Sequence, residues 1–261
     1  MYPVIFKIYG LTVYSYGAML ALAFLLAIVT AVFRAQKLKI DSQVIFDLGI
    51  VVILSGVLGA RLFFVLLNFS YYAKNPAEII RMDKGGLVVL GGVIVSIIIV
   101  YIYCRVKRLD PFDIADIVAP SLSLGQAVGR LGCFLNGCCW GIPTGLPIGV
   151  CFPPRDFMPA EYWGIPLHPV QLYNTFGNLI LFCFLSYIFK KRKVKGEVFA
   201  FYLILHPILR FGMEFLRGDN EKAFAGLTVF QIMSIFLFIA GVIMMAVIRK
   251  NKKLKVKSGK K

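Results

Sequence analysis

The chain has 261 residues, of which 59% are hydrophobic, and its formal net charge is +16 at pH 7. A mean hydropathy of +0.80 excludes an ordinary soluble domain. The net charge would otherwise suggest nucleic acid, but the basic residues stand in short runs between apolar stretches. This pattern is typical of a polytopic membrane protein, and we expect no nucleic-acid partner.

Seven stretches are long enough to cross about 30 Å of hydrocarbon as helices. In chain order they are 14–33, 44–67, 86–104, 114–136, 169–189, 197–216 and 225–248. The fourth and the sixth are the least apolar, because each carries an arginine and several polar residues. The sequence therefore predicts an all-α integral membrane protein, a single polytopic domain over 1–261 with seven transmembrane helices.

Basic runs between the stretches predict the orientation. Nineteen of the 29 lysines and arginines follow the first, third, fifth and seventh stretches, eight of them in the tail 249–261. Cytoplasmic segments carry such an excess, so we expect the N-terminus outside and the C-terminus with its basic tail in the cytoplasm. The first basic cluster follows the apolar run instead of preceding it, which favours an anchor over a cleavable signal peptide.

Three of these stretches contain an arginine: Arg61 in the second, Arg130 in the fourth and Arg210 in the sixth. An arginine at the centre of a bilayer helix costs about 2.5–3.5 kcal/mol on insertion scales. Three guanidinium groups at membrane depth therefore indicate a site for an anion. Phosphate is the first candidate, because the planar guanidinium donates two parallel hydrogen bonds to it.

The end of the fourth stretch combines this arginine with small residues. Arg130, Cys133 or Phe134, and Gly137 share one helical face, with Asn136 to one side. Close backbone approach to a neighbouring helix is possible through glycines at positions 125, 129, 132 and 137. Together with Arg130 they predict a tightly packed polar site.

The loop 137–168 holds six of the twelve prolines and both tryptophans. Its aromatic residues Trp140, Tyr162 and Trp163 suit the level of the lipid headgroups. We therefore expect an ordered rim on the outer surface in place of a disordered loop.

Six cysteines raise the questions of metal and disulfide. Cys133, Cys138 and Cys139 lie near the outer end of the fourth stretch, and Cys151 lies in the following loop. There is no CxxC pair and no histidine in this cluster, so we expect no metal site. A disulfide from Cys138 or Cys139 to Cys151 is left open.

In the sixth stretch, His206, Arg210, Glu214 and Arg217 follow one another at spacings of four, four and three, which places them on one helical face. Two interpretations are open. In one, Glu214 neutralises Arg210 or Arg217 in an intrahelical ladder without a ligand. In the other, this face contributes to the anion site.

The segment GRLGCFLNGCCWG at 129–141 resembles the signature GRxGNFxNGExxG of the prolipoprotein diacylglyceryl transferases, which are bacterial inner-membrane enzymes. The order and spacing of further segments match over about 220 of the 261 residues. These are YGAML from Tyr16, GARLFFVL around Arg61, GGLVVLGG at 85–92, ADIVAP at 115–120, HPVQLY at 168–173 and RFGMEFLRGDNE from Arg210.

The resemblance implies transfer of the diacylglyceryl group of phosphatidylglycerol to the lipobox cysteine thiol of a prolipoprotein. A thioether forms, glycerol 1-phosphate is released, and neither metal nor cofactor is needed. By matched position, Arg130 and Arg210 are assigned to the phosphate and to catalysis. The other lipid-binding assignments are Tyr16, Asn136, Arg61 and Gly137; the supporting residues are His168, Gln171, Glu214 and Asp116.

The chain also departs from the family pattern. Leu90 stands where many members have a histidine proposed as the base, and Cys133 and Cys138 replace an asparagine and a glutamate of the signature. His206 replaces a common tyrosine four residues before the second arginine. We hypothesise that His206 supplies part of the base function; the alternative is a buried histidine bonded to a backbone carbonyl. A lipid transporter or flippase, or an altered paralogue that only binds anionic lipid, stays open as an alternative function.

Overall fold

The computed structural model describes residues 2–8, 11–81, 85–154, 158–220 and 222–258. Residues 155–157 of the predicted rim and 259–261 of the predicted tail lie outside this description. The chain forms two compact units, one of residues 1–31 and 115–261 and the other of residues 32–114. The expected single domain therefore stays a prediction, and each unit is described by itself.

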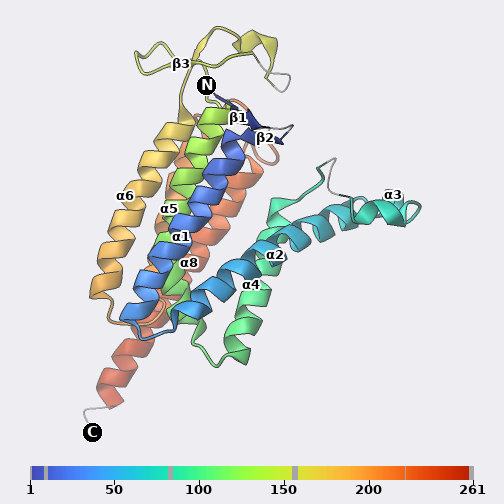
Figure 1. Ribbon diagram of the computed structural model, residues 1–261. Helices are drawn as coiled ribbons and strands as arrows, with labels where there is room; N and C mark the ends of the chain where they lie inside the picture. The colour runs from blue at the N-terminus through green and yellow to red at the C-terminus, as the bar shows by residue number, and fades with distance from the viewer. Residues whose placement is uncertain (1, 9–10, 82–84, 155–157, 221, 259–261) are drawn as a thin grey trace. The chain divides into compact units, whose positions relative to one another are not determined.

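The larger unit is a helical bundle with a hairpin and a rim at one end (Figure 1). Its hairpin pairs β1 (Val4–Ile8) antiparallel with β2 (Leu11–Tyr14), and Val4 lies opposite Tyr14. Its long helices are α1 (Ser15–Lys37), α5 (Pro111–Asn136), α6 (Val170–Lys191), α7 (Glu197–Glu214) and α8 (Val229–Ser258). The rim between α5 and α6 contains β3 (Val150–Cys151), the 3-10 helix η2 (Ala160–Tyr162) and β4 (Pro166–Leu167).

The smaller unit pairs α2 (Ser42–Leu67) with α4 (Val89–Val106). Between them lie α3 (Phe69–Tyr72) and the 3-10 helix η1 (Pro76–Ile79). The Asp41 side chain caps α2 by accepting a hydrogen bond from the Gln43 amide at 3.0 Å. Ser55 and Ser96 bond across the two helices at 3.0 Å, so the pair is joined by polar as well as apolar contacts.

Within the described part of the chain, five helices are long and apolar enough to cross a membrane: α1, α2, α4, α6 and residues Val229–Lys252 of α8. The predicted fourth and sixth stretches also form helices, α5 and α7, but fall outside this group. The reason is their polar content: α5 carries Asp113, Asp116 and Arg130, and α7 carries Glu197, His206, Arg210 and Glu214. The all-α membrane class is supported, while the count of seven stays a prediction.

Apolar side chains on the outside of these helices support the membrane class. Phe236 and Ile243 of α8 are 68% and 59% exposed, and Ile97 of α4 is 64% exposed. Monomers in water rarely expose so much apolar surface, and such surface marks contacts with lipid or with other proteins.

Candidate functional site

Close packing of α5 on α1 positions the end of α5. A Cβ atom on Gly132 would stand 3.0 Å from Met19 Cβ and 3.4 Å from the Tyr16 ring, so a larger residue would have to push α1 or its side chains away. Gly125 also faces α1, whereas a Cβ on Gly129 would meet nothing within 4 Å. The predicted glycine contact is thus confirmed at two positions, and Gly129, next to Arg130, lies on an open part of the helix.

Arg130 is a half-buried cation that forms no hydrogen bond or ion pair with any described residue. It interacts electrostatically with Tyr16 of α1 and with His206 and Arg210 of α7. The fold therefore brings together predicted site residues from three helices. A guanidinium in this position has its donors available for an external anion.

Only part of the Arg210 guanidinium has a partner among the described residues. Its Nη2 forms an ion pair with Glu214 Oε2 at 3.0 Å, and its guanidinium lies 4.5 Å from the centre of the Phe230 ring. Its Nη1 is buried without a hydrogen-bond partner among the described residues. Glu214 thus neutralises Arg210, as the ladder interpretation expected, but one donor of Arg210 is still unused. A buried donor without a partner costs about 1–3 kcal/mol, which an anionic ligand would recover.

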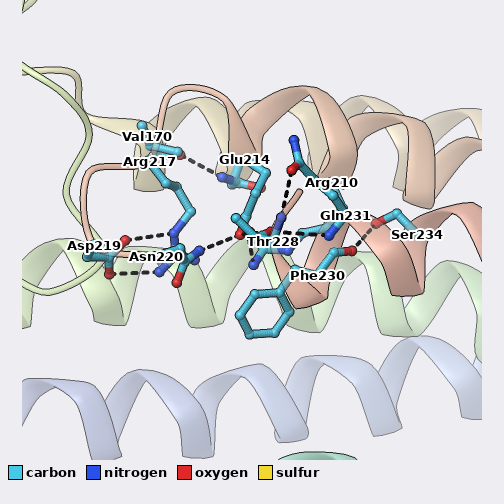
Figure 2. A network of polar contacts seen from close by, with 11 residues as sticks. Val170, Arg210, Glu214, Arg217, Asp219, Asn220, Thr228, Phe230, Gln231 and Ser234 are labelled. Carbon is cyan, nitrogen blue, oxygen red and sulfur yellow. Dashed lines mark hydrogen bonds and ion pairs between the residues drawn. The ribbon is translucent and has the colours of Figure 1, made fainter. Parts of the chain in front are cut away.

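Arg217 does not take part in that ladder. It makes two parallel hydrogen bonds of 2.8 Å to the carboxylate of Asp219 (Figure 2). Among the described cations of this face, only Arg210 forms a direct ion pair with Glu214.

A capping box at the start of α8 fixes Glu214 in turn. The Thr228 hydroxyl donates to Glu214 Oε1 at 2.8 Å and accepts from the Gln231 amide, and the Gln231 side chain accepts from the Thr228 amide at 3.0 Å (Figure 2). Asn220 donates to the same carboxylate oxygen at 2.5 Å. None of these three residues was predicted to belong to the site, although Thr-x-x-Gln before an apolar run is a recognisable helix start for Thr228 and Gln231.

His206 lies on the same face of α7 as Arg210. Its ring stacks on Tyr202 at 5.1 Å between centroids, and Gln126 of α5 donates to the Tyr202 hydroxyl at 3.0 Å. His206 Nδ1 is buried and has no hydrogen-bond partner among the described residues. The structure therefore shows no bond from His206 Nδ1 to a backbone carbonyl, which the alternative interpretation required of one ring nitrogen.

The rim holds the end of α5 against the end of α7. The Gly141 amide donates to the His168 carbonyl at 3.0 Å, and the Ile142 amide donates to the Leu216 carbonyl at 2.9 Å. The rim has its own buried cluster of Trp140, Phe152, Met158 and Leu167. Among the described residues the loop therefore has a packed core, and its place on the outer surface stays a prediction.

Two supporting residues, one in α6 and one just before it, lie against this end of α5. Gln171 is fully buried and donates to the Cys138 carbonyl at 2.7 Å. His168 Nδ1 bonds to the Tyr173 hydroxyl at 3.1 Å. Gly137 ends α5 with a left-handed φ of 78°, and Asn136 bonds to the thiol of Cys138. These residues shape the end of α5, on which Arg130 lies.

The structure answers the open question of a disulfide and brings three of the cysteines together. All six are free thiols, and the Cys151 thiol donates to the Gly164 carbonyl at 3.6 Å. The Sγ atoms of Cys133, Cys138 and Cys139 lie within 4.8 Å of one another, so they form a group that could hold a metal ion. The spacing of the cysteines did not predict this group, because it forms only when the chain reverses after α5. The expectation of no metal site stays a prediction.

Arg61 does not have the role that its sequence context suggested. Its guanidinium donates five hydrogen bonds to backbone carbonyls of the smaller unit, those of Glu78, Ile79, Arg81, Gly85 and Gly86, at 2.5–3.1 Å. An arginine has five N–H donors, so none is left for phosphate. The assignment of Arg61 to lipid binding is corrected to a structural role in the 78–86 segment.

We expect Arg61→Lys to destabilise the smaller unit, because an ammonium has three donors and leaves at least two carbonyls without a partner. At about 1–3 kcal/mol for each, the loss is about 2–6 kcal/mol. Thermal unfolding in detergent and the rate of proteolysis after Lys74 and Arg81 measure it. A variant with unchanged stability and a raised KM for phospholipid would contradict the structural role.

Asp116 supports the fold at a distance from Arg130. It is fully buried and accepts from Arg192 at 2.7 Å, from the Gly196 amide at 2.8 Å and from the Phe199 amide at 2.9 Å. Fourteen residues of α5 separate it from Arg130, about 21 Å at 1.5 Å per residue. It therefore fixes the start of α7 and does not belong to the candidate site.

Comparisons with known proteins show the family of this chain. The family model described as prolipoprotein diacylglyceryl transferase matches residues 3–247. A phosphatidylglycerol–prolipoprotein diacylglyceryl transferase of Clostridium tetani is 38% identical over 252 residues, which cover 97% of this chain and 100% of the relative. A protein of the same name from Finegoldia magna is 37% identical, over 99% of both chains. One from Clostridium perfringens is 32% identical, over 91% of this chain and 92% of the relative.

Proposed function

This chain belongs to the prolipoprotein diacylglyceryl transferase family, and we propose that its substrates are phosphatidylglycerol and the lipobox cysteine of prolipoprotein signal peptides. It is an enzyme of the first step of lipoprotein maturation, as its relatives are named. A lipid transporter, or a paralogue that only binds anionic lipid, is not favoured.

The observation that carries the site assignment is the pair of Arg130 and Arg210. Two cations lie near enough to repel each other, and only one of them has a carboxylate partner. Together they leave an uncompensated positive charge and the unused donor Nη1 of Arg210. We assign these groups to the phosphate of phosphatidylglycerol, whose negative charge grows as it leaves. Donors placed where charge develops are usually the largest contribution to catalysis.

In the reaction that we propose, the sulfur of the substrate cysteine attacks the glyceryl carbon joined to the phosphate. The S–C bond forms while the C–O bond to the phosphate breaks, and the bonding electrons pass to the phosphate oxygen. The thiol proton is accepted by His206 and ends on the released glycerol 1-phosphate. Tyr16, next to Arg130 and 42% exposed, is placed to hydrogen-bond the lipid headgroup.

His206→Phe tests the base. The variant keeps an aromatic ring against Tyr202 but has no nitrogen to accept a proton, so we expect kcat to fall about 10²-fold. A neutral imidazole is the active form of a base, so the wild-type rate should fall as pH decreases through the histidine titration. In His206→Phe the rate should no longer fall in this pH range. Full activity of His206→Phe between about pH 5.5 and 8.5 would exclude His206 as the base.

We also propose that α5 and α7 cross the membrane with the other five helices, which gives seven spans in the bacterial inner membrane. Arg130 of α5 and Arg210 and Glu214 of α7 belong to the candidate site, and Asp116 of α5 is buried in an ion pair with Arg192, so a membrane helix can carry these polar residues. The rim and the N-terminal hairpin lie at one end of the larger unit, and the C-terminal end of α8 lies at the other (Figure 1). This agrees with an outward N-terminus and a cytoplasmic C-terminus.

The activity is tested with the purified chain, phosphatidylglycerol and a peptide that contains a lipobox cysteine. We expect the peptide to gain the mass of a diacylglyceryl group and glycerol phosphate to appear in equal amount. A peptide with serine in place of the cysteine is the matched control. A folded sample that yields neither product would overturn the proposal.

A further inference from the structure

The end of α5 carries three thiols that the transfer reaction does not use, because its nucleophile is the substrate's own cysteine. Cys133 lies in the last turn of α5, and Cys138 and Cys139 follow the helix end. Their Sγ atoms are all within 4.8 Å of one another. Three sulfurs that bind one ion at metal–sulfur distances of about 2.3 Å stand roughly 4 Å apart. The three sulfurs would therefore have to move only slightly closer together to bind one ion.

The backbone holds this group in place. The Gly137 and Cys138 amides both donate to the Cys133 carbonyl, at 3.0 and 3.1 Å, which folds the chain back over the helix end. Cys139 then adopts a left-handed φ of 65°, a conformation that costs a non-glycine residue about 1–2 kcal/mol. Strain of this kind is found where a structure fixes a functional group. Here it turns Cys139 back to Cys133.

Two other parts of the chain bind to the residues that follow α5. Gln171 of α6 donates to the Cys138 carbonyl at 2.7 Å, and the Gly218 amide donates to the Trp140 carbonyl at 3.1 Å. The thiols are half-buried, so the group is shielded and still accessible to a small ion. A preorganised set of ligands loses little freedom on binding.

Two cations lie close to one of the three thiols. Arg217 and Arg130 both attract negative charge on Cys139. Three thiolates and one monovalent cation carry a net charge of −2, which Arg130, without a carboxylate partner among the described residues, partly offsets. A divalent cation would leave −1.

We propose that Cys133, Cys138 and Cys139 form a three-thiolate binding site for a soft, thiophilic metal ion, monovalent copper. Sulfur ligands select Cu(I) and zinc among the common metals. Structural zinc sites are almost always four-coordinate, and the described residues offer no fourth histidine, cysteine or carboxylate in this group. A set of three sulfurs therefore favours Cu(I).

The test uses the full chain in detergent with a reductant that contains no thiol, and Cu(I) competed against a coloured Cu(I) chelator. We expect one equivalent to bind, and X-ray absorption to show sulfur neighbours only. Loss of an outer-shell partner alone lowers metal affinity about 10–100-fold, so Cys133→Ser and Cys139→Ser should each lower it at least that much. Cys151→Ser and Cys183→Ser, at exposed thiols outside the group, are the matched controls and should bind normally.

A second measurement needs no variant and so does not depend on how the substituted chains fold. Bound Cu(I) should protect Cys133, Cys138 and Cys139 from alkylation, read by mass spectrometry of their peptide, while Cys151 stays reactive. Equal alkylation with and without Cu(I), or unchanged affinity in a folded Cys133→Ser chain, would overturn the site. Zinc that binds more tightly than Cu(I), with an oxygen or nitrogen as fourth ligand, would overturn the choice of metal.

Copper at this site has a consequence for the enzyme that rests on the proposed function, whereas binding itself does not. Cys133 is one helical turn from Arg130, so an occupied site places negative charge beside the proposed phosphate site. We expect Cu(I) to raise the KM for phosphatidylglycerol in the wild-type chain and not in Cys133→Ser. If Cu(I) binds with the expected stoichiometry and KM is unchanged, this consequence is wrong and the metal site stands.

Discussion

Arg130→Ala is expected to lower kcat/KM for diacylglyceryl transfer by about 10²–10³-fold, the loss found when one donor to a developing anion is removed. Arg130 forms no ion pair or hydrogen bond with any described residue, so its substitution leaves no buried carboxylate without a partner. Stability should therefore change little, in contrast to most substitutions of a membrane arginine. Arg130→Lys keeps the charge but loses the planar fork, and we expect it to recover only part of the rate.

The measurement is steady-state transfer to a lipobox peptide at several phosphatidylglycerol concentrations, together with the thermal midpoint of each variant. Arg105→Ala removes an exposed arginine from the last turn of α4 and is the matched control, with unchanged rate and midpoint. If Arg130→Ala unfolds the chain, or if Arg130→Lys is fully active, Arg130 is a structural residue and the phosphate assignment is wrong.

The comparison of Arg61 with Arg130 shows where sequence reasoning reaches its limit. Both lie in apolar stretches, and the insertion cost predicted a ligand for each. In the structure, Arg61 uses all five donors on carbonyls between Glu78 and Gly86, whereas Arg130 donates to none of the described residues. Those carbonyls are about 20 residues away in a segment without regular periodicity. Nothing local in the sequence distinguishes a saturated arginine from an available one.

Contacts that follow helical periodicity were easier to predict. The spacing of His206, Arg210 and Glu214 placed them on one face of α7, and the ion pair of Arg210 with Glu214 follows from i,i+4 geometry. The glycine contact of α5 was predicted for the same reason. The three-thiol group was not, because it depends on a left-handed turn at Cys139, a conformation that cysteine seldom adopts.

The second large effect is expected at Arg210, where activity and stability can be separated. Arg210→Ala removes a phosphate donor and also leaves Glu214, which is 4% exposed, without its cation. Breaking a buried pair by removing one partner costs about 3–5 kcal/mol. This variant should therefore lose both transfer activity, by about 10²–10³-fold, and much of its thermal stability.

The double variant Arg210→Ala with Glu214→Gln resolves the two contributions. Glutamine keeps an oxygen to accept from Thr228 and Asn220 and carries no charge, so the stability lost in Arg210→Ala should largely return. Activity should not return, because the donor to the phosphate is still missing. Glu214→Gln alone keeps Arg210 and should retain the greater part of the rate. Recovery of activity together with stability in the double variant would mean that Arg210 acts only by holding the fold, and Arg130 would then be the only guanidinium assigned to the phosphate.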